Sequence, residues 1–120
     1  MPAYTLVVHL YAKNDCIDKV KAKLQEASQV YSKDKECLSW FVMQDHKDSQ
    51  AFTIVERYAH ESSQKYHLEN PYWKTFDGYV IPLLDKDMEL HRYNELDTNE
   101  EVRVEKDPEL WKAVEEHQTY

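Results

Sequence analysis

One short segment of the chain gathers several side chains that can transfer protons or form directed hydrogen bonds. The segment His67-Leu68-Glu69-Asn70-Pro71-Tyr72-Trp73 carries an imidazole, an amide, a phenol and an indole. Histidine has the unperturbed pKa closest to neutral pH, which suits it to act as a base. Tyr72 can donate a hydrogen bond to a substrate oxygen, and Asn70 can orient a carbonyl group. These residue types suit chemistry on a small organic molecule.

Two tryptophans extend this candidate site. Trp40 and Trp73 can line a pocket for an aromatic ligand, because such pockets are mainly apolar with a few placed polar groups. Each residue also has a structural explanation: tryptophans pack in cores, and a tyrosine is often half-buried with its hydroxyl in water. An asparagine before proline ends a helix, and His67 can form a hydrogen bond within its own helix. The sequence leaves both interpretations open.

Several other chemistries lack their motifs. The six histidines include no His-x-x-x-His pair or carboxylate cluster with metal-ligand spacing, and His60 and His67 lie too far apart for one ion. A serine elbow and a recognisable Cys-His arrangement are also missing. The single glycine excludes a glycine-rich loop for phosphates or dinucleotides. We therefore expect no metal and no bound nucleotide cofactor.

Charge and composition exclude further classes. The net charge is −8, with 15 basic residues scattered among 23 acidic ones, whereas nucleic-acid binders carry a basic patch. The N-terminal residues show no secretion signal, and no apolar run reaches membrane-spanning length. The chain has two cysteines without Cys-x-x-Cys spacing. We expect a cytoplasmic protein that binds neither nucleic acid nor a membrane.

Hydrophobic periodicity predicts four strands and three helical segments in the first 95 residues. Alternating or continuous apolar runs predict strands over 4–12, 37–44, 50–58 and 87–93. Apolar residues at helical spacing predict an amphipathic helix from Ile17 to Tyr31, with Asn14 or Asp15 as its cap. Helical segments over 61–69 and 72–84 are separated by Pro71. The order strand, helix, strand, strand, helix, strand is typical of the ferredoxin-like α+β fold, with the first and third strands central.

The strands are apolar at both parities, as Trp40 with Phe41 and Ile54 with Val55 illustrate. Helices can cover only one face of such a sheet, so we expect the other face to pack on a second copy in a homodimer. Glu56 lies in an apolar strand and needs a partner, for which Arg92 is one candidate.

We expect residues 96–120 to form a separate C-terminal extension. The segment up to Lys106 is acidic and poorly patterned, while Asp107-Pro108 is a favourable helix start. Leu110, Trp111 and Val114 can form one face of a short helix. We expect this extension to pack on its own domain, residues 1–95, or on a partner.

Three segments together resemble the antibiotic biosynthesis monooxygenase family, whose members form dimeric α/β barrels. They are Cys37-Leu38-Ser39-Trp40, Phe52-Thr53-Ile54-Val55-Glu56-Arg57-Tyr58 and the segment that begins at His67. The resemblance covers roughly residues 4–95. The chain departs from the family pattern at Glu36, where glycine is usual, and at Tyr72-Trp73, where a second histidine and phenylalanine are frequent.

The resemblance implies a cofactor-independent oxygenase that uses dioxygen to oxidise a small electron-rich aromatic molecule, such as a quinol or an anthrone. It also implies that His67 is the catalytic base. From the side-chain chemistry given above, we expect Tyr72 to assist His67, and Trp40, Asn70 and Trp73 to contact the substrate. The missing second histidine favours an alternative, a small-molecule binder without catalytic activity. Haem handling is a third possibility, since relatives of this fold degrade haem.

Overall fold

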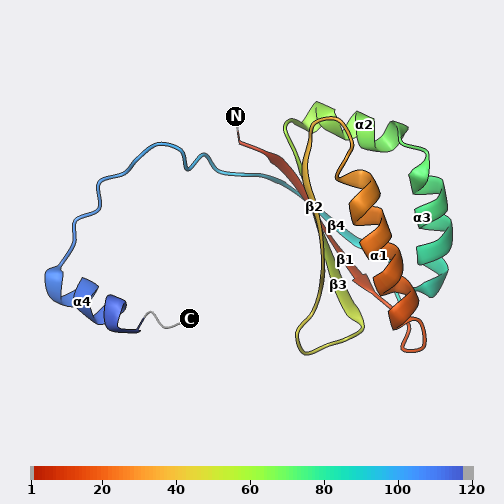
Figure 1. Ribbon diagram of the computed structural model, residues 1–120, viewed down its shortest axis with the longest axis horizontal. Coiled ribbons are helices and arrows are strands. Elements are labelled where there is room, and N and C mark those ends of the chain that lie inside the picture. The colour runs from red at the N-terminus through yellow and green to blue at the C-terminus, as the bar shows by residue number, and fades with distance from the viewer. Residues whose placement is uncertain (1, 118–120) are drawn as a thin grey trace.

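The computed structural model describes residues 2–117 of the chain (Figure 1). Its elements are β1 (Tyr4–Tyr11), α1 (Ile17–Tyr31), β2 (Cys37–Gln44), β3 (Ala51–Tyr58), α2 (Gln64–Glu69), α3 (Tyr72–Val80), β4 (Glu89–Asn94) and α4 (Pro108–His117). One turn of 3₁₀ helix precedes α2 at Glu61–Ser63, and another follows α3 at Ile81–Leu83. The predicted order of strands and helices is confirmed, and Pro71 separates α2 from α3 as expected.

The four strands form one antiparallel sheet in the order β2-β3-β1-β4. The predicted central position of the first and third strands is therefore confirmed, and the fold is the ferredoxin-like α+β fold. Val8 pairs with Ile54 on one side and with Leu90 on the other, so these three side chains share one face. No helix among residues 2–117 is long and apolar enough to cross a membrane.

The prediction that Asn14 or Asp15 caps α1 is wrong. The residue before the helix is Cys16, and its side chain makes no capping hydrogen bond. The Cys16 N–H instead donates to the Lys13 carbonyl at 2.9 Å, so Asn14 and Asp15 lie within a backbone turn that precedes the helix. Backbone hydrogen bonds replace the side-chain cap that the sequence favoured.

Glu36 stands where the family usually has glycine, and its backbone conformation is one that favours glycine. Its φ angle is 61°, in the left-handed region that glycine adopts without strain. Glu36 accepts a hydrogen bond from the hydroxyl of Ser63 at 2.8 Å, and Ser63 is buried. The carboxylate thus supplies a contact that a glycine cannot make, which offsets part of the backbone strain.

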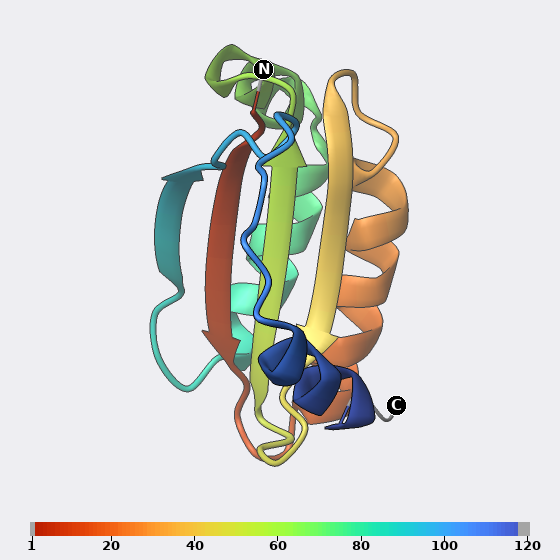
Figure 2. The same ribbon diagram turned by 90° about the vertical axis from the view of Figure 1, so that its left-hand side faces the viewer.

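The main core lies between the sheet and the helices. α1 buries its apolar stripe, Val20, Leu24, Ala27 and Tyr31, against the inner face of the sheet. Figure 2 shows the outer face of the sheet, on which no helix among the described residues of the domain packs. We call this outer surface the open face; it includes Val7, Phe41, Met43, Val55 and Tyr93. Phe41 is 54% exposed there.

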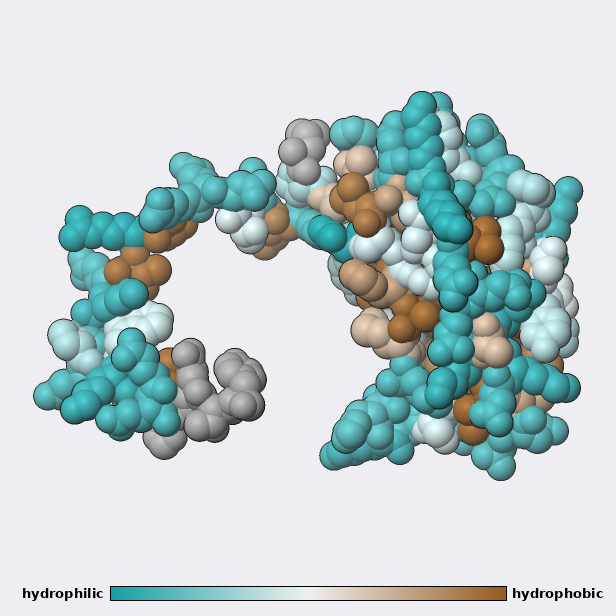
Figure 3. Space-filling view, viewed as in Figure 1, coloured by the Kyte–Doolittle hydropathy of each residue, from teal (hydrophilic) through white to brown (hydrophobic). Residues whose placement is uncertain are grey.

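The extension leaves the sheet after β4 and stands apart from the domain. It runs in front of the open face, and α4 lies across a gap from it (Figures 1 and 2). Figure 3 shows hydrophobic side chains both on the tail and on the side of the domain that faces it. Leu110 on α4 is 63% exposed. The extension was expected to pack either on its own domain or on a partner. In the structure its described residues do not pack on its own domain.

Hydrogen bonds to Glu95 connect the start of the extension to the sheet. The Glu95 carboxylate accepts hydrogen bonds from Arg57 Nε at 2.7 Å and Nη2 at 2.8 Å, and another from the Thr5 hydroxyl. These bonds, first from Arg57 and then from Thr5, lower the pKa of Glu95 from 4.5 to about 2.

We expect Glu95→Gln to reduce the free energy of unfolding by about 0.5–1 kcal/mol at pH 7, since the pair is partly exposed and screened by solvent. Because the folded state lowers the pKa of Glu95, its stabilising effect is fully present above about pH 4.5 and is lost as the pH falls towards 2. Urea unfolding at several pH values measures this. Glu101→Gln, at an exposed tail position, is the control. An equal loss at pH 2 and pH 7 would contradict the assignment.

Candidate functional site

A cavity of about 530 Å³ lies between the inner face of the sheet and the helices. All four strands contribute residues to its wall, most of which is apolar or aromatic. The apolar and aromatic residues of the wall, from strands, helices and loops, are Leu6, Val8, Tyr31, Trp40, Ile54, Leu68, Trp73, Phe76, Met88 and Leu90. Four polar residues complete the wall: Glu56, Gln64, His67 and Asp77. Its size and composition are typical of small-molecule sites.

His67 lies in this wall between two carboxylates. Its Nε2 atom is 3.8 Å from Glu56 Oε1, and its Nδ1 atom is 3.9 Å from Asp34 Oδ2. All three side chains are largely buried, with exposed fractions of 15% for His67, 13% for Asp34 and 7% for Glu56. Both distances exceed hydrogen-bond length. His67 Nδ1 and Asp34 Oδ2 have no hydrogen-bond partner within the described chain, so a small ring movement can join them.

Asn70 holds the loops around this histidine. Its amide nitrogen donates to Asp34 Oδ1 at 2.8 Å, and its amide oxygen accepts from the Tyr72 N–H at 3.1 Å. Asn70 also ends α2, as the structural explanation expected. It therefore connects the end of α2, the start of α3 and the loop after α1. Asn70 does not belong to the cavity wall.

Glu56 has a different partner from the one suggested by the sequence. The hydroxyl of Tyr58 donates to Glu56 Oε1 at 2.7 Å, and these two residues share the inner face of β3. Burial, and then the neighbouring Glu56 charge, raise the pKa of Tyr58, so the phenol stays protonated as a donor. Arg92 forms no ion pair with Glu56 among the described residues. Glu56 instead faces His67 and the cavity.

The remaining predicted residues divide into two groups. Trp40 is buried and Trp73 is 39% exposed, and both line the cavity with His67. The indole of Trp40 stacks on the imidazole, with ring centres 6.5 Å apart. Tyr72 points elsewhere, because its hydroxyl donates to Glu26 of α1 at 2.6 Å. The structure thus brings together His67, Trp40 and Trp73, and places Tyr72 and Asn70 outside the wall.

Asp34, Tyr31 and Asp77 lie at the site but were not predicted from the sequence as site residues. Asp34 follows a helix end, where acidic residues are common, and carries no distinguishing pattern. Asp77 had a usable signal, since it lies one turn after Trp73 and so shares its face of α3. No group of three or more His, Cys, Asp or Glu side chains within residues 2–117 is arranged to hold a metal ion.

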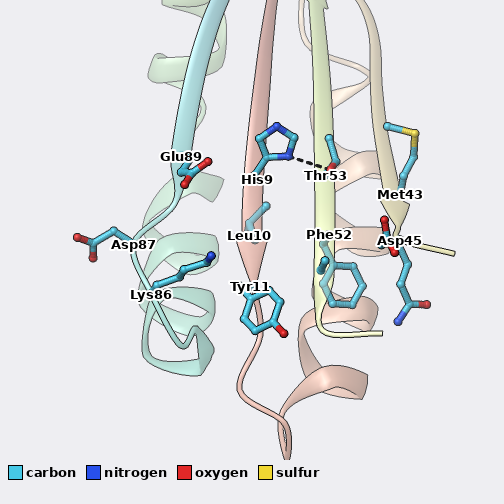
Figure 4. A pocket seen from close by; sticks show the side chains of 12 residues that line it. His9, Leu10, Tyr11, Met43, Asp45, Phe52, Thr53, Lys86, Asp87 and Glu89 are labelled. Carbon is cyan, nitrogen blue, oxygen red and sulfur yellow. Dashed lines mark hydrogen bonds between the residues drawn. The ribbon is translucent and has the colours of Figure 1, made fainter. Parts of the chain in front are cut away.

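A second hollow, of about 420 Å³, lies on the open face (Figure 4). His9 Nδ1 lies 3.1 Å from the Thr53 hydroxyl, and the rings of His9 and His91 are 5.9 Å apart. Tyr11, Met43 and Lys86 also line it. Because this hollow belongs to the face that lacks a covering layer, a second copy on that face would enclose it.

The fold and the cavity define a small ferredoxin-like domain with one polar site set in an aromatic-walled pocket. The family model for antibiotic biosynthesis monooxygenase matches residues 3–78, which is more than half of the chain. The chain therefore belongs to the antibiotic biosynthesis monooxygenase family, and the resemblance inferred from the sequence is confirmed. No curated protein matches the sequence significantly.

Solved structures agree with this fold. A conserved protein from Methanosarcina mazei Go1 is 20% identical with a TM-score of 0.74, over 80% of this chain and 95% of that one. PA3566 from Pseudomonas aeruginosa is 18% identical with a TM-score of 0.74, over 81% and 97%. A candidate antibiotic biosynthesis monooxygenase from Chloroflexus aurantiacus J-10-fl is 29% identical with a TM-score of 0.65, over 82% and 97%.

Proposed function

We propose that this protein is a cofactor-independent monooxygenase that oxidises a small electron-rich aromatic molecule, such as an anthrone or a quinol, with dioxygen. One observation carries the proposal: the imidazole of His67 lines an aromatic-walled cavity and is flanked by the carboxylates of Asp34 and Glu56. Membership of the monooxygenase family supports the reaction class. Trp40 and Trp73 are proposed to hold the aromatic rings of the substrate.

In the proposed reaction, His67 Nε2 removes a proton from the substrate, and Asp34 holds Nδ1–H so that Nε2 carries the lone pair. The carbanion or phenolate that forms can give one electron to dioxygen. For an anthrone, the resulting radical and superoxide combine into a C–O bond, and His67 returns its proton to make a hydroperoxide. Loss of water from the hydroperoxide leaves a carbonyl. The overall change is CH₂ plus O₂ giving C=O plus H₂O.

Oxygen consumption by the purified, metal-free protein with anthrone and menadiol tests the proposal. Anthrone oxidised under ¹⁸O₂ should yield anthraquinone that carries the label in its new carbonyl, together with labelled water. Consumption no faster than the protein-free background with every anthrone and quinol tried would overturn the proposal. Ligand binding without turnover would then assign the protein to the alternative class of non-catalytic binders.

Tyr72 and Asn70 are proposed to position the site without contacting the substrate. We expect Tyr72→Phe to change the oxidation rate by less than about threefold, because the hydroxyl is bonded to Glu26 outside the cavity. Steady-state oxygen uptake measures the effect. A loss of about 100-fold would instead show that this hydroxyl takes part in proton transfer, as the sequence suggested.

We further propose that the open face packs on a second copy to form a homodimer. Support comes from the apolar side chains that this face exposes, above all Phe41 and Met43, which are 54% and 47% exposed. An exposed patch of this kind on a sheet is otherwise an aggregation liability. Sedimentation at micromolar concentration tests this, and a monomer there would contradict it.

The extension is proposed to be a separate part, residues 96–120, that packs on that second copy. Support comes from its separation from its own domain and from the exposed Leu110 and Val114 of α4, which are 63% and 37% exposed. A chain that ends at Glu95 should keep its fold and bind the second copy more weakly. Unchanged dimer affinity would contradict this role.

A cytoplasmic location is also proposed. Both cysteines are free thiols in the structure, which agrees with a reducing compartment. Burial raises the pKa of Cys37 to about 11, so this thiol is unreactive at neutral pH. Detection of the protein in a soluble cytoplasmic fraction would support the location, and detection outside the cell would contradict it.

A further inference from the structure

The cavity wall has an uneven charge. The wall contains the carboxyl groups of Glu56 and Asp77 and the imidazole of His67, and none of the described residues that line the cavity is a lysine or an arginine. Asp34 lies directly behind His67 and adds a third carboxylate close to the site. Bound ligands therefore meet acidic groups and aromatic rings, with no permanent positive charge from the wall.

Asp77 is the carboxylate in this wall that lacks a partner. It lies on α3, one helical turn after Trp73, and its side chain is half-buried. Within residues 2–117 its carboxylate accepts no hydrogen bond, whereas Glu56 accepts one from Tyr58. Burial raises the pKa of Asp77, and the nearby His67 opposes part of that rise. A carboxylate in this position can accept a hydrogen bond from a ligand.

We propose, on the basis of the function proposed above, that the cavity selects uncharged aromatic substrates that carry a hydroxyl donor, rejects anionic ones, and owes this selectivity chiefly to Asp77. The geometry gives each part of such a ligand a contact. Trp40 and Trp73 can contact the rings, His67 can take the acidic proton, and Asp77 can accept a hydrogen bond from the hydroxyl donor.

An anionic ligand loses in two ways at this site. Its charge gives up hydration on entering a largely apolar cavity, and no lysine or arginine of the described wall replaces that hydration. Its charge is also repelled by Asp77 and Glu56, and the repulsion is stronger at low effective dielectric constant than in water. A neutral ligand of the same shape avoids both costs.

Binding of a matched ligand pair tests the inference: 6-hydroxy-2-naphthoate and its methyl ester. The two have the same ring system and hydroxyl group, and they differ in charge and in the one methyl group of the ester. Titration calorimetry on the full chain at pH 7 without oxygen gives both dissociation constants. We expect the ester to bind at least about tenfold more tightly than the acid. Equal affinities, tighter binding of the acid, or no binding of either ligand would overturn the inference.

Asp77→Asn then tests the residue itself, since it removes the charge and keeps the size. The preference for the ester over the acid should fall at least about threefold, mainly through tighter binding of the acid. Asp18→Asn on the exposed side of α1 changes the net charge equally and should leave the preference unaltered. If Asp77→Asn also leaves it unaltered, the assignment of Asp77 is wrong.

This test is separate from the test of catalysis. Because binding is measured without oxygen, a protein that prefers the ester yet never consumes oxygen would refute the monooxygenase proposal and leave the selectivity intact. A protein that consumes oxygen yet binds both ligands equally would do the reverse.

Discussion

Replacing His67 with glutamine is expected to lower kcat for anthrone oxidation at least about 100-fold, the usual size of a general-base contribution. Glutamine fills a similar volume and keeps hydrogen-bonding atoms, but it cannot accept a proton near neutral pH. The imidazole lines the cavity, and its Nε2 atom lies 3.8 Å from Oε1 of Glu56, another residue of the wall. The substitution thus removes the proposed base from the cavity wall.

The measurement separates a catalytic role from a structural one. Substrate affinity, measured without oxygen, should change by less than about threefold in His67→Gln, so that the loss appears in kcat. His46→Gln is the matched control, because His46 lies in an exposed loop and does not belong to the cavity wall. If His67→Gln keeps its kcat, the proposed base is wrong. If it loses binding and thermal stability together, His67 is a structural residue.

Asp34 marks the limit of what the sequence could predict about this site. His67 was predicted from its residue type and its family position, and Trp40 and Trp73 were predicted from their residue type. Asp34 is 33 residues from His67 along the chain, and only the packing of the loop after α1 against α2 brings the two together. Contacts between segments so far apart depend on tertiary structure, which local patterns do not specify.

Tyr72 shows the opposite limit. Its position beside Asn70 and Trp73 suggested one cluster, but neighbours on a helix point in different directions, about 100° apart. Trp73 therefore turns to the cavity while Tyr72 turns to α1 and bonds to Glu26. Asp77 shares the direction of Trp73, so helical spacing within α3 was a better guide to the site than sequence adjacency.

The fold was more predictable than the site because its signal is repeated along each element. Apolar residues at Val20, Leu24, Ala27 and Tyr31 recur four or three positions apart, and all four are buried in the structure. The cap of α1 depended on a single residue, and there a backbone turn replaced the expected side chain. A prediction that rests on many residues stays correct when one local contact differs from the expected one. A prediction that rests on a single residue does not.

Placing a charge on the open face is expected to separate the proposed dimer. Phe41 pairs with Val55, which in turn pairs with Val7, so it belongs to an apolar row that crosses three strands. Burying an aspartate there in the dimer would leave its charge without a partner, which is costly. We expect Phe41→Asp to raise the dimer dissociation constant at least about 30-fold, as for an aromatic hot spot.

The control for this variant is Ile81→Asp, since Ile81 is exposed to nearly the same degree, 55% against 54%, but lies beside α3 in the helix layer. Sedimentation over a range of concentrations should show weakened association for Phe41→Asp alone, with both variants folded by circular dichroism. Loss of association in both variants, or in neither, would place the contact elsewhere on the molecule. A folded Phe41→Asp monomer that still oxidises anthrone would further show that the cavity is complete within one chain, as expected from a wall built by its own four strands and helices.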